Sequence, residues 1–261
     1  MKQIITVFDV TDAPWHVLTF ACKLAKEESA LIHGIFLHEP TGDTQFKYPF
    51  PNDLTLTKEK SADESIKKEN LSLVDDNIRL FSEECESAGV SYKIDKDFMI
   101  EQVITDTSAD LIIADYRAEF LDDLLPKMVR PAFLVSENEL PKHIILMYDG
   151  SESAIYACEK FASLFPKWTG LPTDLLAINH SKDELASAAL NNIKKNYPNL
   201  TETYLEGKVH DRLVDYLEKN NEHVLVVMGS FGRSGVSQFF RQSLASVVLK
   251  EARVSVFIAH K

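Results

Sequence analysis

The chain alternates predicted strands and helices through its first half, and the same order then restarts in its second half. Several of the strands are continuous apolar runs, which are typical of a parallel sheet covered by helices on both faces. The pattern therefore predicts an α/β protein made of two doubly wound, five-stranded parallel-sheet units fused in tandem. The predicted strands are 4–8, 30–37, 90–94, 111–114 and 132–135, then 144–148, 173–178, 201–205, 224–228 and 255–259; the predicted helices are 12–28, 63–87, 101–108 and 121–128, then 153–165, 182–196, 210–220 and 243–251.

Matching segments of the two halves indicate a duplication. Asp9 and Asp149 end equivalent strands, ITVFD and ILMYD, and DLIIAD at 110–115 corresponds to VLVVMG at 224–229. Self-similarity over this length is a mark of repeated units. We predict domains at residues 1–138 and 142–261, with the boundary in the polar segment 137–141.

Helix signals are clearest in the first half. Asp12 is the expected N-cap of the first helix, with Pro14 in its first turn, and Gly89 is expected to end the helix at 63–87. The segment 38–60, which contains Phe46 and Tyr48 among its aromatics, has no counterpart in the second half. A loop of this length is either a functional lid or a surface excursion, and its aromatics favour packing against the end of the sheet.

Charge and apolar content restrict the partners and the location. The formal net charge is −12 with no basic patch, which excludes nucleic acid and anionic membrane surfaces as expected partners. No stretch reaches the roughly 18 uninterrupted apolar residues of a membrane helix, and the N-terminus does not resemble a signal peptide. We expect a soluble, cytoplasmic protein.

Cysteine and histidine spacing does not predict a disulfide or a metal site. Cys22, Cys85 and Cys158 are widely spaced and are expected to be buried free thiols. His33 and His38 are expected to be packing or edge residues.

The sequence contains no catalytic motif. It lacks H-E-x-x-H, G-x-S-x-G, G-x4-G-K-[ST] and G-x-G-x-x-G elements. Nucleotide-dependent synthetases of similar architecture carry a glycine-rich loop after the first strand, whereas here that turn is only Asp149-Gly150-Ser151-Glu152. We therefore predict no catalytic residues.

A glycine-punctuated segment follows the fourth strand of the second half. It reads Met228-Gly229-Ser230-Phe231-Gly232-Arg233-Ser234-Gly235, and a helix is expected from about Ser243. In open parallel sheets, ligands bind beyond the carboxyl ends of the strands. Glycines let backbone approach a ligand closely, and a helix N-terminus attracts phosphate. Asp149 and Gly150 are expected to face this loop.

These residues resemble the universal stress proteins in their tandem two-domain form, most specifically through MGSFGRSGVSQFFRQSLASVVLK at 228–250. The resemblance implies strand order 3-2-1-4-5, as in flavodoxin-like and adenine nucleotide alpha hydrolase-like proteins. It also implies that the final strands of the two units pair with each other. The ATP-binding members carry G-x2-G-x9-G-[ST]; Gly229 and Gly232 fit its first glycines, Ser243 its hydroxyl, and Asp149 the aspartate that contacts the nucleoside.

The resemblance implies a cofactor site for ATP, with Mg²⁺ if nucleotide is bound. Ser230, Gly232, Arg233 and Ser243 would hold the phosphates, and Asp149, Ala177 and Met228 would flank the nucleoside. The full set of candidate binding residues is Asp149, Gly150, Ala177, Met228, Gly229, Ser230, Gly232, Arg233, Gln242, Ser243 and Leu244.

Two departures from the family pattern weaken this site. Gln242 stands where the last glycine belongs, and its Cβ and long side chain restrict φ and fill space at the phosphate position. Arg241 beside it either compensates with a charge for phosphate or is an ordinary solvated residue.

The first half departs further. Fifteen positions separate Asp115 from Arg130, whereas 24 separate Gly229 from Arg253, so the first half lacks nine residues of the loop. Asp115 also replaces the first glycine, where its charge would repel a nucleotide. We expect no ATP in the first unit.

Three functional hypotheses follow. The first is a non-enzymatic stress-response sensor or regulator with an adenine-nucleotide site in the second unit only. The second is a structural or partner-binding module of the same fold that binds no nucleotide, and the third is a slow ATPase. The chain is expected to form an intramolecular pseudo-dimer, either alone or within a further homodimer.

Overall fold

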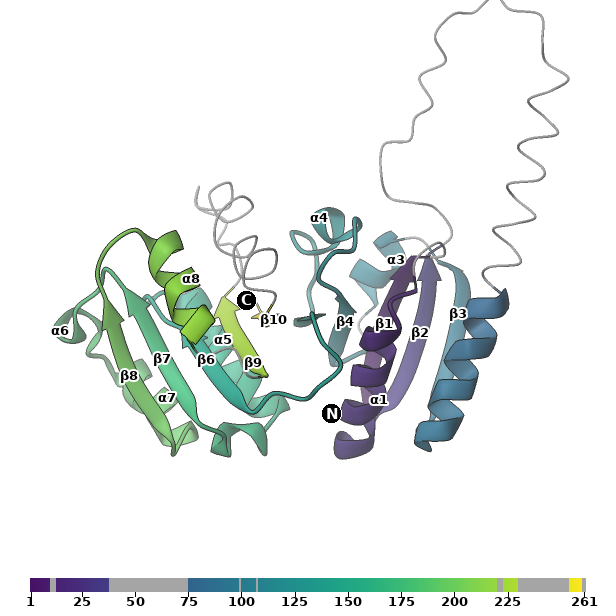
Figure 1. Cartoon of the computed structure of the whole chain (residues 1–261), viewed down its shortest axis with the longest axis horizontal. Helices are drawn as coiled ribbons and strands as arrows, with labels where there is room; N and C mark the ends of the chain where they lie inside the picture. The colour runs from purple at the N-terminus through teal and green to yellow at the C-terminus, as the bar shows by residue number, and fades with distance from the viewer. Residues whose placement is uncertain are drawn as a thin grey trace, which may run out of the picture.

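The computed structural model describes residues 1–9, 13–37, 75–98, 100–106, 108–219, 223–229 and 254–259. They form one ten-stranded sheet with helices on both faces (Figure 1). The strand order is β3-β2-β1-β4-β5-β10-β9-β6-β7-β8. Each set of five strands therefore has the predicted 3-2-1-4-5 order, and the predicted fold class is confirmed.

The first unit comprises the strands β1 to β5 and their helices. Its strands are all parallel to one another. The elements are β1 (Gln3–Asp9), α1 (Trp15–Glu28), β2 (Leu31–Leu37), a helix at residues 75–88, β3 (Tyr92–Phe98), α3 (Ile100–Thr105), β4 (Leu111–Asp115), α4 (Leu121–Leu124) and β5 (Ala132–Val135).

The second unit comprises β6 to β10 and their helices, and its strands are likewise parallel. The elements are β6 (His143–Met147), α5 (Glu152–Leu164), η1 (Trp168–Gly170), β7 (Thr173–Ile178), α6 (Lys182–Leu185), α7 (Ala188–Asn196), β8 (Leu200–Leu205), α8 (Val209–Lys219), β9 (Val224–Gly229) and β10 (Ser255–Ala259).

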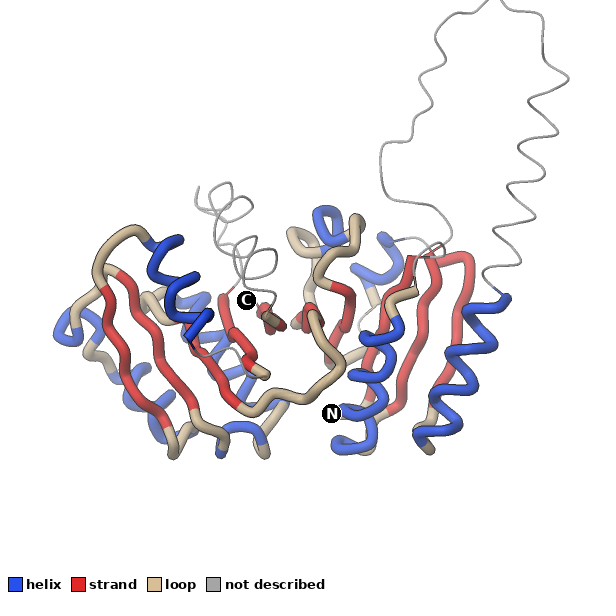
Figure 2. Tube along the Cα trace, in the orientation of Figure 1, coloured by secondary structure: helices blue, strands red, loops and turns tan. Residues whose placement is uncertain are grey.

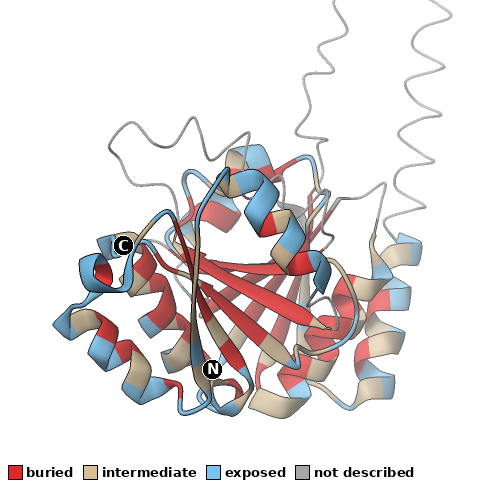
Figure 3. Cartoon of the chain, turned by 60° about the vertical axis from the view of Figure 1, so that its left-hand side comes forward, coloured by how far each residue is buried: buried red, intermediate tan, exposed pale blue. Residues whose placement is uncertain are grey.

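Two apolar layers sandwich the sheet because successive side chains of a strand point to opposite faces. One layer contains Ile4 and Phe8 of β1 with α1, the helix at 75–88, α5 and α7. The other contains Ile5 and Val7 with α3, α4 and α8. Figure 3 shows the resulting pattern, with buried strands between helices that are buried on their inner side only.

The two units join through their final strands. β5 and β10 pair antiparallel, with Phe133 opposite Phe257, while every other strand pair of the sheet is parallel. Figure 2 shows the strands of both units in red with the helices in blue. Phe133 also contacts the rings of Phe20, Phe165 and Trp168. Aromatic side chains from both units therefore form one buried cluster at the seam, and the predicted pairing of the final strands is observed.

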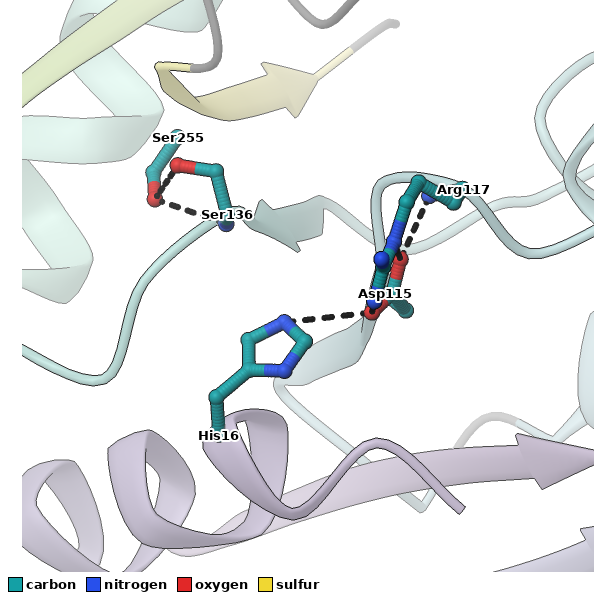
Figure 4. Close-up of polar contacts among 5 residues, drawn as sticks. All are labelled: His16, Asp115, Arg117, Ser136 and Ser255. Carbon is teal, nitrogen blue, oxygen red and sulfur yellow. Dashed lines mark hydrogen bonds and ion pairs between the residues drawn. The ribbon is translucent and has the colours of Figure 1, made fainter. Parts of the chain in front are cut away.

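Polar contacts reinforce the seam. The Ser136 backbone N–H donates to Ser255 Oγ over 3.1 Å, and the two hydroxyls are also 3.1 Å apart (Figure 4). On α1, Glu27 accepts a hydrogen bond from the indole N–H of Trp168 at 3.2 Å. Contacts of this kind fix the two units against each other as one body.

Several predicted boundaries were wrong. The first helix begins at Trp15 with Pro14 as its N-cap residue, not at Asp12, which lies outside the described residues. The third strand covers Tyr92–Phe98 rather than 90–94, and the helix predicted at 121–128 ends at Leu124. The helix predicted at 182–196 is two helices, because Ser187 caps a new helix by accepting from the Leu190 N–H at 3.1 Å.

Other predictions fall partly outside the described residues. These are the segment 38–60 with His38, the first part of the helix at 63–87, and the helix at 243–251. Cys22, Cys85 and Cys158 are buried free thiols, as predicted. Among the helices that the structure describes, none has the length and apolar character needed to cross a membrane.

Candidate functional site

The carboxyl end of β6 holds Asp149 in a fixed turn. Its Oδ1 accepts a hydrogen bond from the Ser151 N–H at 2.9 Å, and Ser151 Oγ in turn accepts from the Ala154 N–H at 3.2 Å to cap α5. Gly150 between them has φ +78°, a conformation that favours glycine. The Asp149 side chain is exposed, so its carboxylate is held in place and remains open to solvent.

Gly229, the last residue of β9, packs directly against the first turn of α5. A Cβ built on Gly229 would lie 2.5 Å from the backbone carbonyl carbon of Ser153 and 2.6 Å from its oxygen. Both atoms are backbone, so rotating a side chain cannot relieve this overlap. The first glycine of the predicted phosphate motif is therefore required for packing the strand against the helix.

The structure brings only part of the predicted site together. Asp149, Gly150 and Gly229 lie at the same edge of the sheet, where β6 and β9 are neighbours. Ala177 and Met228 are buried in the layers on opposite faces of the sheet, so their side chains belong to the core. The remaining candidates lie outside the described residues: Ser230, Gly232, Arg233, Gln242, Ser243 and Leu244, with Arg241.

The equivalent position in the first unit carries the carboxylate of Asp115. Its Oδ1 accepts hydrogen bonds from the backbone N–H of Arg117 at 2.6 Å and from Arg117 Nε at 3.1 Å. Its Oδ2 accepts from Arg117 Nη2 at 3.1 Å and lies 3.1 Å from His16 Nε2 (Figure 4). Asp115 is only 5% exposed, so this is a buried anion enclosed by basic side chains and a backbone N–H.

These contacts control the ionisation of Asp115. Burial alone would raise its pKa, but the contact with His16 and the hydrogen bonds from the Arg117 side chain and backbone outweigh burial and lower the pKa from 3.8 to about 2. Asp115 is therefore ionised at neutral pH despite being buried.

The ends of β9 and β4 differ because the first helix of each unit begins at a different distance from the strand before it. α5 begins at Glu152, three residues after Asp149, whereas α1 begins at Trp15, six residues after Asp9. The first turn of α5 lies against Gly229, which leaves no room there for a side chain. In the first unit the Asp115 side chain instead reaches His16, in the first turn of α1.

Sequence reasoning identified Asp115 as an unfavourable charge but missed both of its basic neighbours. The spacing Asp115-x-Arg117 was a usable signal, because Asp commonly accepts a hydrogen bond from the backbone two residues later. His16 lies 99 positions from Asp115 in the chain, and only the pairing of β1 with β4 brings the two together.

A separate groove of about 370 Å³ lies beside α6, α7 and β8. An ion pair between Lys194 Nζ and Glu202 Oε1, 2.7 Å apart, forms part of its wall. None of the predicted site residues that the structure describes lines it. Its lining residues are Lys182, Ala186, Ser187, Ala188, Leu190, Asn191, Lys194 and Glu202. Within the described part of the chain, no group of three or more His, Cys, Asp or Glu side chains could hold a metal ion.

Comparison with known proteins places these features in context. Residues 141–260 match the model of the Universal stress protein family. The crystal structure of a universal stress protein from Archaeoglobus fulgidus is similar to the whole chain, with TM-score 0.65, 16% identity, and coverage of 98% of this chain and 98% of that one. A functionally unknown protein from Pseudomonas aeruginosa has TM-score 0.57 and 13% identity over 100% of this chain and 92% of its own. No curated protein sequence matches the chain. At these identities the structural likeness shows the fold alone.

Proposed function

Because residues 141–260 match the model of the Universal stress protein family, we propose that this chain is a non-enzymatic stress-response sensor or regulator that binds adenine nucleotide in its second unit only. The observation that carries the proposal is the contrast between equivalent strand ends. β9 ends in Gly229, beside an exposed carboxylate at Asp149. β4 ends in the buried, ionised Asp115. The strand end at β9 keeps an open carboxylate that can accept a hydrogen bond from a nucleoside, whereas the end of β4 is filled by the buried side chain of Asp115.

Different residues of the second unit would bind the ribose and the phosphates of the nucleotide. Asp149 is held by the Ser151 N–H through Oδ1, and no hydrogen bond from a described residue reaches its Oδ2. That oxygen can accept a hydrogen bond from a ribose hydroxyl. Ser230, Gly232, Arg233 and Ser243 would hold the phosphates, with Mg²⁺ entering as the counter-ion of ATP. In the first unit, the end of β4 lacks both the open carboxylate and the phosphate loop. Its Asp115 carboxylate is buried, and the loop that follows is nine residues shorter.

Thermal unfolding with added nucleotide tests this proposal. A ligand present at 100 times its Kd stabilises the folded state by about 2.7 kcal/mol. We expect ATP with Mg²⁺ to raise the melting temperature, with a stoichiometry of one nucleotide per chain by calorimetry. Two nucleotides per chain would contradict the assignment to the second unit alone.

Matched variants locate the ligand. Asp149→Ala removes an exposed carboxylate and should abolish most of the ATP-dependent stabilisation. Asp122→Ala, which removes an exposed carboxylate on α4 of the first unit, should leave it unchanged. Equal loss in both variants would argue against a site at Asp149.

The other two hypotheses give different outcomes in the same experiments. A melting temperature that millimolar ATP, ADP, AMP and cyclic nucleotides leave unmoved supports the structural or partner-binding module. Gain of binding in Gln242→Gly would then identify a blocked phosphate loop. Steady release of phosphate from ATP, lost in Asp149→Ala, would support the slow ATPase.

A further inference from the structure

The first unit has an anion-binding arrangement that its own side chain fills. Arg117 directs its backbone N–H, Nε and Nη2 to the Asp115 carboxylate, and His16 Nε2 lies 3.1 Å from the same group. A phosphate oxygen is bound by the same kinds of group: a guanidinium, an imidazole ring and a backbone N–H. We propose that His16 and Arg117 form a phosphate-class anion site whose permanent occupant is the carboxylate of Asp115.

The position of the cluster supports this inference. Asp115 ends β4, beside β1, at the carboxyl edge where ligands of open parallel sheets bind. α1 makes no side-chain hydrogen bond at its N-cap residue, Pro14, and has no acidic residue in its first turn. The nearby Asp115 carboxylate supplies the negative charge that a helix N-terminus favours. In the second unit, the N-terminus of α5 has its own cap and its own negative charge. Ser151 is the N-cap and accepts the Ala154 N–H, and Glu152 is an acidic residue in the first turn.

Occupancy from within the chain excludes free anions. Asp115 is tethered to β4, so its carboxylate is present at a high effective concentration that a free phosphate cannot match. Its burial also separates the bound carboxylate from bulk water. The Asp115 carboxylate therefore takes the place of an anionic ligand in the first unit. This adds to the effect of the shortened loop. This inference does not depend on whether the second unit binds nucleotide.

Replacing Asp115 with a shorter neutral residue tests the inference. Asp115→Ser removes the charge and opens space, while the hydroxyl can still accept the Arg117 N–H. With inorganic phosphate as the probe and sodium chloride at matched ionic strength, we expect Asp115→Ser to bind phosphate about tenfold or more tightly than the wild type, because the competing anion is gone. Phosphorus NMR titration and thermal shift are the two readouts. Asp123→Ser on α4 is the matched control and should behave as the wild type.

A second substitution identifies the groups that hold the phosphate. Adding Arg117→Ala to Asp115→Ser should return phosphate binding to the wild-type level. A folded Asp115→Ser protein that binds phosphate no better than the wild type would overturn the inference. So would a gain that survives the loss of Arg117.

A measurement on the native Asp115 covers the case in which Asp115→Ser does not fold. Carbon NMR of the carboxyl group follows its ionisation in the wild type and in Arg117→Ala. We expect the pKa of Asp115 to rise in Arg117→Ala, because the carboxylate loses the two hydrogen bonds from the Arg117 guanidinium. An unchanged pKa would show that Arg117 does not hold the carboxylate, and the inference would fail. If ATP does not stabilise the wild type, the proposed nucleotide site of the second unit fails. The phosphate and pKa experiments on Asp115 still test the first unit separately.

Discussion

Gly229→Ala would show how much of the glycine requirement comes from packing rather than from a ligand. The added methyl group would lie 2.5 Å from the carbonyl carbon of Ser153, closer than real Cβ contacts allow, so β9 or α5 has to shift. Overpacking of this kind costs about 1–3 kcal/mol, and because the atoms that are met are backbone we expect the upper part of that range.

Gly170→Ala provides the matched control. A Cβ on Gly170 meets nothing within 4 Å, and Gly170 does not have the positive φ that would strain an alanine. At such a position the change from glycine to alanine stabilises by about 0.4–1 kcal/mol, because the unfolded chain loses freedom. Both variants lose a glycine, so the difference between their unfolding free energies isolates the steric cost at Gly229.

Urea unfolding without nucleotide measures both variants. Trp168 is buried in the aromatic cluster at the seam, with its ring stacked on Phe165 at 4.5 Å, so its fluorescence reports loss of the packed state. We expect a lower urea midpoint for Gly229→Ala and an unchanged or higher one for Gly170→Ala. Equal free energies of unfolding for the two variants would refute the packing argument and leave the ligand as the reason for glycine.

Two further predictions concern the seam and the buried carboxylate. Phe133→Ala should lower the unfolding free energy by about 3–5 kcal/mol, because Phe133 is fully buried among rings of both units, and circular dichroism in urea will measure the loss; a loss below 1 kcal/mol would show that the cluster does not hold the units together. Asp115→Asn should cost about 2 kcal/mol at pH 7, since lowering the Asp115 pKa from 3.8 to about 2 stabilises the fold at all pH values above the ordinary pKa. This contribution disappears as the pH falls through about 2, so the stability curves of variant and wild type should converge between about pH 4 and pH 2; a constant gap would contradict the role given to ionisation.

The strands were predictable where their sequences are continuous apolar runs. β5 and β10 match their predicted ranges, and both are buried along their whole length. β3 was misplaced because it lies at the edge of the sheet, where its sequence YKIDKDF mixes charged and apolar residues and gives no such run. Charged residues on edge strands are common, since they discourage pairing with other chains.

Helix ends were predicted less well because local chemistry decides them. α4 ends at Leu124 although Leu125 keeps a helical backbone, because Pro126 has no N–H to donate to the carbonyl of Asp122 and the helix cannot continue through it. The split between α6 and α7 depends on Ser187, whose side chain accepts the Leu190 N–H and so caps the start of a second helix. The Asp115 cluster required a contact between residues far apart in the chain, which periodicity and motif spacing do not report.

The seam between β5 and β10 also has a consequence for how the protein can evolve. In a two-fold homodimer every substitution occurs twice, so a change that closes one binding site closes both. Here the strands that meet are different stretches of one chain, and Phe133 faces Phe257 rather than a second Phe133. Each half can therefore change independently while the shared sheet stays intact. Covalent fusion thus permits the asymmetry between Asp115 and Gly229, which a dimer of identical chains could not maintain.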